Sequence, residues 1–454
     1  MTEYYRPPAP HPRGTLSSIV RSVATGGNDI LRLLPDVLYH KQMVRIPFLR
    51  NPTYVVNCPI TIKRIMSERL DNYPKSQMMT NPLDALVGDS IFTVSGDTWN
   101  RQRRMIAEVF AKLRLVDVFD VMRESIDDYL ARLDAQVGGT IDIDADMAYV
   151  TADVIFRTMF SRPIKDVEAR LIFDEFTRYQ DSLPHTSGRA IFLAGKNRQA
   201  PPMPRAALES AQKIREVIAA LLHERRSGKV RQDDICQIIA DCRDPESGVM
   251  FTDVEALDQI AFFFLAGHET SASALTWALI SLAGDQGIAD EVAAEVETVT
   301  NNGPVTFQNR KRLHLTNAVF KEALRLYPSV SFFTRSPIEG EVLRGFDVKA
   351  GNELIISPWV VQRHRDFWEL PDHFVPKRHL PGHGVAIKPG TWMPFGFGPR
   401  VCTGAAFATM EAELILSEVT RRFRLTVQQP EKIEPVSRLT VRPKKRVKAL
   451  VERR

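Results

Sequence analysis

A single cysteine in a glycine-rich loop is the residue of this 454-residue chain best suited to chemistry. Cys402 lies within residues 395–404, and a helix-prone run begins shortly afterwards at Ala405. The positive end of that helix and the charge of Arg400 favour thiolate over thiol, and a thiolate is a strong ligand for soft metals. Three glycines allow unusual backbone conformations and a close approach to a flat partner: Gly396, Gly398 and Gly404.

The order of five residues in this loop resembles the haem-binding loop of the cytochrome P450 monooxygenases: Phe395, Gly398, Arg400, Cys402 and Gly404. The resemblance implies haem b as the cofactor, with Cys402 as the axial iron ligand and the other loop residues in cofactor binding. A thiolate ligand pushes electron density onto the iron and favours O–O cleavage. The competing interpretation is a buried cysteine in an ordinary turn.

A long helix, predicted over residues 253–284, carries a second chemical motif at residues 266–270. Ala266 and Thr270 are four residues apart and share one helix face, where the Thr270 hydroxyl can bond back to the carbonyl of residue 266. The resulting polar notch resembles the oxygen-activation motif of the family. The small residues Ala266 and Gly267 are expected to let the helix lie close over a flat ring, so Ala266 is a candidate cofactor-binding residue. Glu269 is the candidate relay for protons, with Thr270 beside it.

Two further pairings resemble positions that bind the haem propionates. Trp99 and Arg103 are four apart on a helix, and an indole N–H and a guanidinium together suit a carboxylate. Arg335 matches the residue that pairs with the other propionate in the family. An exposed cation beside an aromatic ring is the alternative for the Trp99 pair taken alone.

A structural network is implied by Glu322 and Arg325, three residues apart on one helix, and by Arg378 further along the chain. In the family such a Glu-Arg-Arg set holds the haem-side core and takes no part in the reaction. Two buried arginines that share one carboxylate need close hydrogen bonding, because an unpaired buried charge is costly.

The predicted substrate pocket is apolar, which favours a hydrophobic substrate such as a terpenoid, fatty acid, alkane or steroid. Residues 75–92 show little periodicity and are expected to form a loop that covers the substrate. Residues 185–204 form a second long connection of the kind that often serves as a lid. The expected pocket residues are Met79, Leu86, Phe262, Phe263, Val330, Phe332 and Phe333.

Periodicity and turn signals predict a mainly α fold with small β-sheets, in which the haem lies between the long central helix and the cysteine loop. A hairpin is expected over residues 44–57 and a short strand over 140–144. Beyond the central helix, helices are predicted over residues 59–70, 97–111, 118–136, 147–160, 167–183, 206–226 and 317–327. We expect an arm with a short helix over residues 1–40 and one catalytic domain over residues 41–454.

Composition excludes several classes of function. The net charge of +5 is mild and no long basic run interrupts the body, so nucleic-acid binding is not expected. The basic residues 442–448 are expected to form a solvated strand end. Four cysteines without a CxxC pair indicate a reducing, cytoplasmic setting, with Cys236 and Cys242 as packing residues. No membrane anchor is expected, and we expect a monomer.

The resemblance implies a monooxygenase that uses O2 and electrons from a separate ferredoxin or flavodoxin with an NAD(P)H-dependent reductase, because no flavin or iron–sulfur module is recognised. A basic face for such a partner is expected from Arg101, Arg104, Lys112 and Arg114. The alternatives are a peroxide-dependent peroxygenase, whose known members lack the acid–alcohol pair, and a haem-thiolate gas sensor without catalysis.

Overall fold

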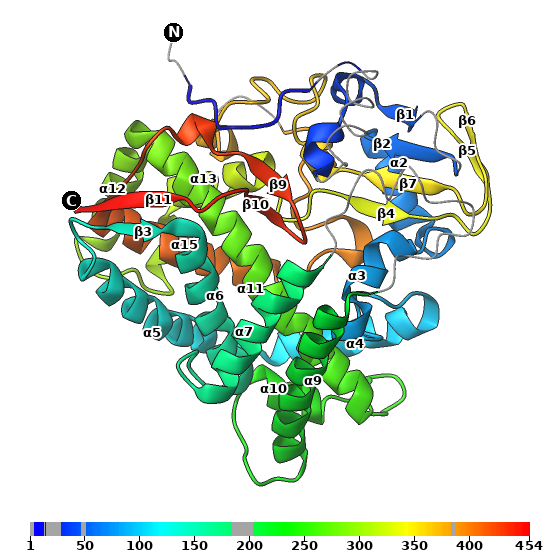
Figure 1. Ribbon diagram of the computed structural model, residues 1–454, viewed down its shortest axis with the longest axis horizontal. Helices are drawn as coiled ribbons and strands as arrows, with labels where there is room; N and C mark the ends of the chain where they lie inside the picture. The colour runs from blue at the N-terminus through cyan, green and yellow to red at the C-terminus, as the bar shows by residue number, and fades with distance from the viewer. Residues whose placement is uncertain (1–3, 13, 15–28, 47–50, 184–202, 383–386) are drawn as a thin grey trace.

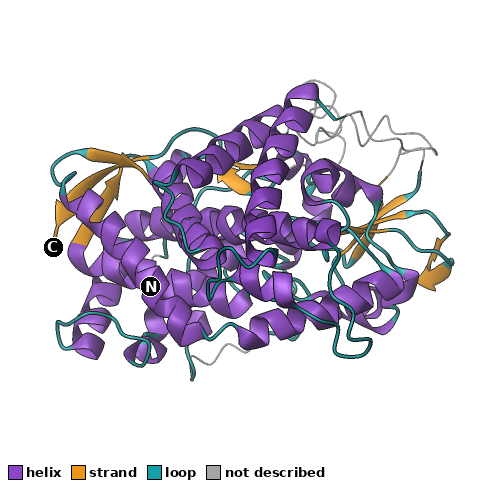
Figure 2. Ribbon diagram, turned by 90° about the horizontal axis from the view of Figure 1, so that it is seen from below, coloured by secondary structure: helices purple, strands orange, loops and turns teal. Residues whose placement is uncertain are grey.

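The computed structural model describes residues 4–12, 14, 29–46, 51–183, 203–382 and 387–454. Helices fill the centre of the molecule, and the strands lie mainly at its two opposite ends (Figure 2). Helix α11 (Asp253–Gly284) crosses the middle of this body (Figure 1). The mainly helical fold with small sheets that the sequence predicts is confirmed.

Helix α11 is long because its start is capped and its sides are covered. Thr252 accepts a hydrogen bond from the Glu255 backbone N–H, and Glu255 accepts one from the Thr252 N–H, which forms a capping box. The helix is apolar on nearly all sides, as a buried helix must be. The helices that pack on it include α6 (Ile143–Phe160), α9 (Arg205–Arg226), α13 (His314–Leu326) and α15 (Ala405–Arg422).

The predicted helices agree with the observed ones to within a few residues, apart from the first. The remaining helices are α2 (Pro59–Lys63), α3 (Gln77–Val87), α4 (Gly96–Lys112), α5 (Leu115–Asp134), α7 (Val167–Ser182), α10 (Ile235–Asp241), α12 (Gln286–Thr300) and α14 (Pro358–Val361). Helix α6 starts four residues before the predicted position because the Asp142 carboxylate accepts a hydrogen bond from the Ala145 N–H and caps it.

The larger sheet has the strand order β1-β2-β7-β4 and contains the predicted hairpin, β1 paired antiparallel with β2. A three-stranded sheet, β3-β11-β8, lies at the C-terminal end and includes the predicted strand at residue 140. The strands are β1 (Met43–Ile46), β2 (Thr53–Val56), β3 (Thr140–Asp142), β4 (Phe333–Arg335), β5 (Glu341–Leu343), β6 (Phe346–Val348), β7 (Glu353–Ile356), β8 (Phe423–Val427), β9 (Pro435–Ser437), β10 (Val441–Pro443) and β11 (Lys448–Arg453).

Two local predictions are wrong. The expected loop over residues 75–92 contains helix α3, although Pro82 lies inside it and removes a backbone donor. Its buried side chains pack against α9 and α11, so tertiary burial outweighs the weak local signal. The expected helix over residues 59–70 breaks after Lys63 into a π turn, η3 (Arg64–Glu68), and a 3₁₀ turn, η4 (Leu70–Asn72).

The N-terminal arm lies against the body over residues 4–12. The Tyr5 ring occupies the space beside Gly284 that a Cβ atom would need. The Tyr327 hydroxyl donates a hydrogen bond of 2.5 Å to the Pro8 carbonyl. The arm therefore covers the end of α11 and the end of α13.

Cys236 and Cys242 are buried in helix packing, as predicted. The predicted lid connection, residues 185–204, falls almost wholly outside the described residues. Over the described parts of the chain, the helices are all too short or too polar to cross a bilayer.

Candidate active site

The cysteine loop depends on two glycines in the left-handed region of the backbone map. Gly396 has φ +82° and Gly398 has φ +69°, and a Cβ atom on Gly398 would overlap the Met66 carbonyl. The Cys402 N–H donates a hydrogen bond of 2.9 Å to the Phe395 carbonyl and closes the loop. Gly404 differs from the prediction, because its φ of −87° is open to any residue.

The environment of Cys402 also differs from the prediction in part. Burial raises the pKa of the Cys402 thiol, while the Gly404 N–H and the charge of Arg103 act against this rise. The residue is nevertheless accessible to solvent. Arg400, expected near the sulfur, instead places its guanidinium 4.3 Å from the centre of the Trp99 ring and donates to the Val94 carbonyl.

Four cations gather near this loop, three of them expected from the sequence: Lys75, Arg103, Arg335 and Arg400. Burial lowers the pKa of Arg335 to about 10, and burial with repulsion from Arg335 and Arg103 lowers that of Arg400 to about 9. Within the described part of the chain, none of the four forms an ion pair with a carboxylate, and the buried Arg335 Nε has no hydrogen-bond partner. Such a cluster fits a dianionic group, as the two propionates of haem would be.

Lys75 is the member that sequence reasoning missed. It is half-buried, its ammonium lies 3.7 Å from the centre of the Phe92 ring, and desolvation and repulsion from Arg400 and Arg335 lower its pKa. An isolated backbone bridge joins Lys75 to Arg335, 260 positions later in the chain. No local pattern in the sequence announces that bridge, so only the tertiary structure identifies Lys75.

The polar notch in α11 has the predicted geometry. The Thr270 hydroxyl donates a hydrogen bond of 2.7 Å to the Ala266 carbonyl, and the Thr270 carbonyl in turn accepts one of 2.8 Å from the Ser329 hydroxyl. Gly267 does not face the same side: a Cβ atom there would lie 2.5 Å from Ile155 Cδ1 of α6. Its small size therefore serves the packing of α6 on α11, which corrects the prediction that it lets the helix approach a ring.

His268 is buried in an aromatic cluster. Its ring stacks on Phe264 at 4.8 Å, meets Phe176 edge-on at 4.7 Å, and shares a hydrogen bond of 3.1 Å with the Phe264 carbonyl. Burial lowers its pKa, so the ring is neutral near pH 7.

Glu269 forms a buried ion pair with Arg442, which the sequence did not predict. Arg442 donates to it from two nitrogens at 2.6 and 3.2 Å, and the Thr440 hydroxyl donates at 2.6 Å. Burial opposes ionisation, but the charge and hydrogen bonds of Arg442, with His268 and the Thr440 hydrogen bond, together outweigh it and lower the pKa of Glu269. Arg442 is only 8% exposed, so the expectation of a solvated strand end over residues 442–448 is wrong at this residue.

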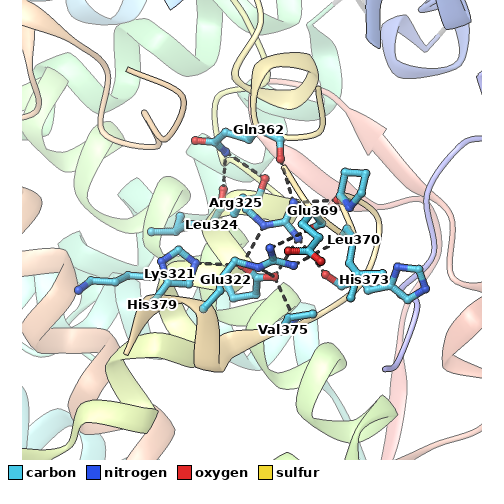
Figure 3. Close-up of polar contacts among 12 residues, drawn as sticks. Lys321, Glu322, Leu324, Arg325, Gln362, Glu369, Leu370, His373, Val375 and His379 are labelled. Atoms are coloured by element: carbon cyan, nitrogen blue, oxygen red, sulfur yellow. Dashed lines mark hydrogen bonds and ion pairs between the residues drawn. The ribbon is translucent and has the colours of Figure 1, made fainter. Parts of the chain in front are cut away.

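Glu322 and Arg325, which Figure 3 labels, lie together in the core with Arg378. Arg325 donates to both oxygens of Glu322, at 2.8 and 2.9 Å, and Arg378 donates at 3.2 Å. His379 is a fourth member, 2.9 Å from the same carboxylate. The arginines also bond backbone carbonyls of residues 362–373, so the network ties α13 to the segment that precedes the cysteine loop.

The expected pocket residues fall into two groups. Leu86 and Phe263 are buried, and the Phe263 ring meets Phe110 edge-on at 5.5 Å. Phe262 is half-buried and stacks on Phe92 at 5.6 Å. The remaining four are also half-buried: Met79, Val330, Phe332 and Phe333.

Three of the four residues of the expected basic face form ion pairs within the chain. Arg101 pairs with Glu255, Arg104 with Asp244 at 3.3 Å, and Arg114 with Asp117 at 3.2 Å. Lys112 is exposed at the end of α4 and has no ion pair among the described residues. Of the four residues, Lys112 is therefore the candidate contact for an acidic partner.

Known proteins resemble this chain over most of its length. Pentalenene oxygenase of Streptomyces avermitilis is 27% identical over 413 residues, which cover 90% of each chain. Cyclooctatin synthase of Streptomyces melanosporofaciens is 27% identical over 412 residues, covering 89% of this chain and 87% of that protein. The crystal structure of the cytochrome P450DA haem domain has the same fold, with a TM-score of 0.80 at 21% identity and coverage of 99% of this chain and 98% of its own.

The sequence model of the family described as Cytochrome P450 matches residues 35–451, which include Trp99, Thr270, Arg335 and Cys402. Together with the shared fold, this match establishes that the chain belongs to the cytochrome P450 monooxygenases, whose cofactor is a haem with a thiolate ligand.

Proposed function

We propose that this P450 inserts one oxygen atom into an apolar small molecule of the terpenoid class, with electrons from a separate ferredoxin or flavodoxin. The observation that carries the proposal is Cys402, an accessible cysteine in a glycine loop ahead of α15, which packs on the notched helix α11. Relatives named for pentalenene and cyclooctatin support the substrate class. The apolar pocket residues support it as well.

The residues near the loop fit the haem and divide its binding between them. Cys402 would supply the sulfur ligand, and Trp99 with the four cations would hold the propionates. When bound, the haem supplies the activation of dioxygen, which takes two electrons and two protons for each oxygen atom inserted. The Glu322 network would keep the segment before the loop in place.

Thr270 and Glu269 are proposed to handle protons. The Thr270 hydroxyl donates its one hydrogen to the Ala266 carbonyl, so the oxygen lone pairs are available to accept a hydrogen bond from a proton donor. A carboxylic acid at position 269 is such a donor once it has taken up a proton. We place this chemistry in the cytoplasm, where the redox partner would be supplied.

The first experiment is the spectrum of the reduced protein under carbon monoxide, for the wild type and for Cys402→Ser. A thiolate ligand should move the Soret band strongly to the red, and the serine variant should lose this band. A wild-type spectrum without the shift, or a serine variant that keeps it, contradicts the ligand assignment.

The second experiment measures products from a panel of terpenoid hydrocarbons, steroids, fatty acids and alkanes. Product formation should require a ferredoxin or flavodoxin, its reductase and NAD(P)H. Equal turnover with hydrogen peroxide alone would favour a peroxygenase. Oxygen consumption without any oxygenated product would contradict the proposed monooxygenase role.

A further inference from the structure

The carboxylate of Glu269 is turned toward the C-terminal strands. Three donors from residues 440–442 surround it, at 2.6, 2.6 and 3.2 Å, and the side chain is buried. The other titratable neighbour is His268 on the same helix, which is buried and neutral near pH 7. In this arrangement Glu269 is ionised and has no proton to give.

Arg442 also binds a second carboxylate. Its NH1 donates to Asp144 Oδ1 at 2.7 Å, and Thr276 donates to the same oxygen at 3.3 Å. Asp144 lies in the first turn of α6, and its side chain is 32% exposed. One guanidinium therefore joins a buried carboxylate in the oxygen motif to a carboxylate that reaches solvent.

The strand that carries Arg442 is fixed to the same helix as Glu269. The Val441 carbonyl accepts hydrogen bonds of 2.8 Å from both the Ser273 hydroxyl and the Trp277 indole, one and two turns after Glu269. Any rearrangement of the ion pair must therefore come from the side chains, because the backbone of β10 is held in place.

Release of Glu269 from Arg442 would normally leave a buried, unpaired cation, which is strongly unfavourable. Here Asp144 still binds the guanidinium after Glu269 has turned away. Arginine itself does not lose a proton in proteins, so Arg442 cannot pass one along. Its part is to hold and release Glu269, and Asp144 makes the release less costly.

We propose that Arg442 is a positioning residue that holds Glu269 as a carboxylate between turnovers, and that Asp144 is the second anchor that lets Glu269 leave. The released carboxylate takes one proton from solvent beside Asp144 and passes it, through the Thr270 hydroxyl, to the oxygen atom that leaves as water. It then returns to Arg442 as a carboxylate. One O–H bond forms and one breaks at Glu269 in each cycle. This inference rests on the proposed role of Glu269 in proton delivery.

Asp144→Asn tests the second anchor with almost no change of shape. The rate constant kcat should fall by about tenfold or more with KM unchanged, because release of Glu269 becomes costlier. The solvent hydrogen-isotope effect and the fraction of oxygen lost as peroxide should rise. Wild-type values of kcat and of the isotope effect would overturn the proposal.

Arg442→Gln and Arg442→Lys test the hold on Glu269. The glutamine variant leaves Glu269 buried without a counter-charge, so its pKa should rise and the acidic limb of the kcat–pH profile should move upward by about one unit or more. Lysine keeps the charge and should restore much of the wild-type profile. An unchanged profile in the glutamine variant would overturn the proposal.

Infrared spectroscopy gives a readout that does not depend on turnover. Arg442→Gln should show a protonated carboxyl band at pH 7 that is absent from the wild type and from the Arg442→Gln, Glu269→Gln double variant. The double variant is the matched control, because it differs from Arg442→Gln only in the carboxyl group of Glu269. Absence of the band from Arg442→Gln, or its persistence in the double variant, would overturn the assignment.

The carbon monoxide spectrum of each variant separates two kinds of failure. A normal red-shifted band with wild-type turnover in Glu269→Gln would refute the relay role of Glu269 and leave the family assignment intact. Loss of the band in the wild type would refute the proposed function itself.

Discussion

Two buried glutamates near the oxygen motif have opposite protonation preferences. Arg442 keeps the pKa of Glu269 low despite its burial. Burial raises the pKa of Glu411 on α15 to about 8, with only the nearby Ser271 hydroxyl acting against the rise. Neither oxygen of Glu411 has a hydrogen-bond partner among the described residues. Glu411 is therefore neutral at pH 7, whereas Glu269 is charged.

Glu411→Gln should change how stability depends on pH. The folded pKa of Glu411 lies above its ordinary value of 4.5, so its contribution is intact below pH 4.5 and is lost as the pH rises toward 8. Relative to the variant, the wild type should lose up to about 1.4 kcal/mol of unfolding free energy per pH unit in this window.

Chemical denaturation of both proteins at several values between pH 5 and 8 measures this difference. A stability difference that does not change with pH would contradict the predicted protonation state of Glu411. Any constant offset between the two proteins reports the packing of the amide and does not bear on the prediction.

For single residues, the sequence predicts those side-chain contacts whose two partners lie close together in the chain. The bond from Thr270 to Ala266 follows from a spacing of four residues on one helix, and the structure has it. Arg442 lies 173 residues from Glu269 and Lys75 lies 260 residues from Arg335. Such contacts depend on how distant segments pack together. The sequence therefore predicted a solvated strand end for Arg442 and predicted no role for Lys75.

At the scale of elements, the packing of α6 on α11 decides which residues can occupy position 267. Gly267 lies against Ile155, and an added methyl group would overlap that side chain. Helices approach this closely only where one of them carries a very small residue, since interiors are packed without spare volume.

Gly267→Ala should therefore destabilise the protein, by about 1–3 kcal/mol, through overpacking. Without the contact, the same substitution in a helix would stabilise it by up to about 1 kcal/mol, so the sign of the change is informative. Ile155→Ala in the same chain should relieve part of the loss.

Gly287→Ala is the matched control. Gly287 lies in α12, where an added Cβ would meet only the Asp285 carboxylate at 3.5 Å, an ordinary contact. Thermal unfolding should show the control to be at least as stable as the wild type. A stabilised Gly267→Ala variant would contradict the assigned helix contact.

The contrast between α11 and α3 explains what the sequence could predict about elements. Helix α11 has a long apolar run with acidic residues at its first turn, and its bounds follow from the sequence alone. Helix α3 contains Pro82 and lacks a clear period, so local signals argue against it. It forms because Leu83, Leu86 and Val87 are buried against other helices.

At the scale of the whole molecule, the N-terminal arm joins parts that are distant in the chain. Tyr5 packs beside Gly284, and its carbonyl accepts a hydrogen bond of 2.9 Å from the Phe374 N–H. Phe374 precedes Val375, whose N–H donates to Glu322. The arm therefore supports the same network that holds the segment before the cysteine loop.

Tyr5→Ala should lower stability by about 2 kcal/mol, because it removes a half-buried ring that packs against Gly284. Tyr4→Ala is the control, since the neighbouring Tyr4 is 37% exposed and should change stability little. Thermal unfolding of the haem-loaded protein measures both. Equal effects of the two substitutions would contradict the docking of the arm through Tyr5.

The charge distribution also bears on the proposed electron donor. Lys112→Glu should slow reduction by an acidic ferredoxin several-fold at low salt, and the difference should shrink as salt is added. Lys349→Glu is the control, because it makes the same change of charge at an exposed position just after β6, away from α4 in the chain. Stopped-flow reduction at two ionic strengths measures the effect. An equal loss in both variants would contradict a docking contact at the end of α4.

Gly398 has an evolutionary consequence. Because its left-handed backbone brings it against the Met66 carbonyl in the π turn η3, neither segment can change its shape alone. Homologues that replace this glycine must also have rebuilt the turn around residue 66. The two positions, 332 residues apart, should therefore covary across the family, and lineages that lost one feature should have lost the other.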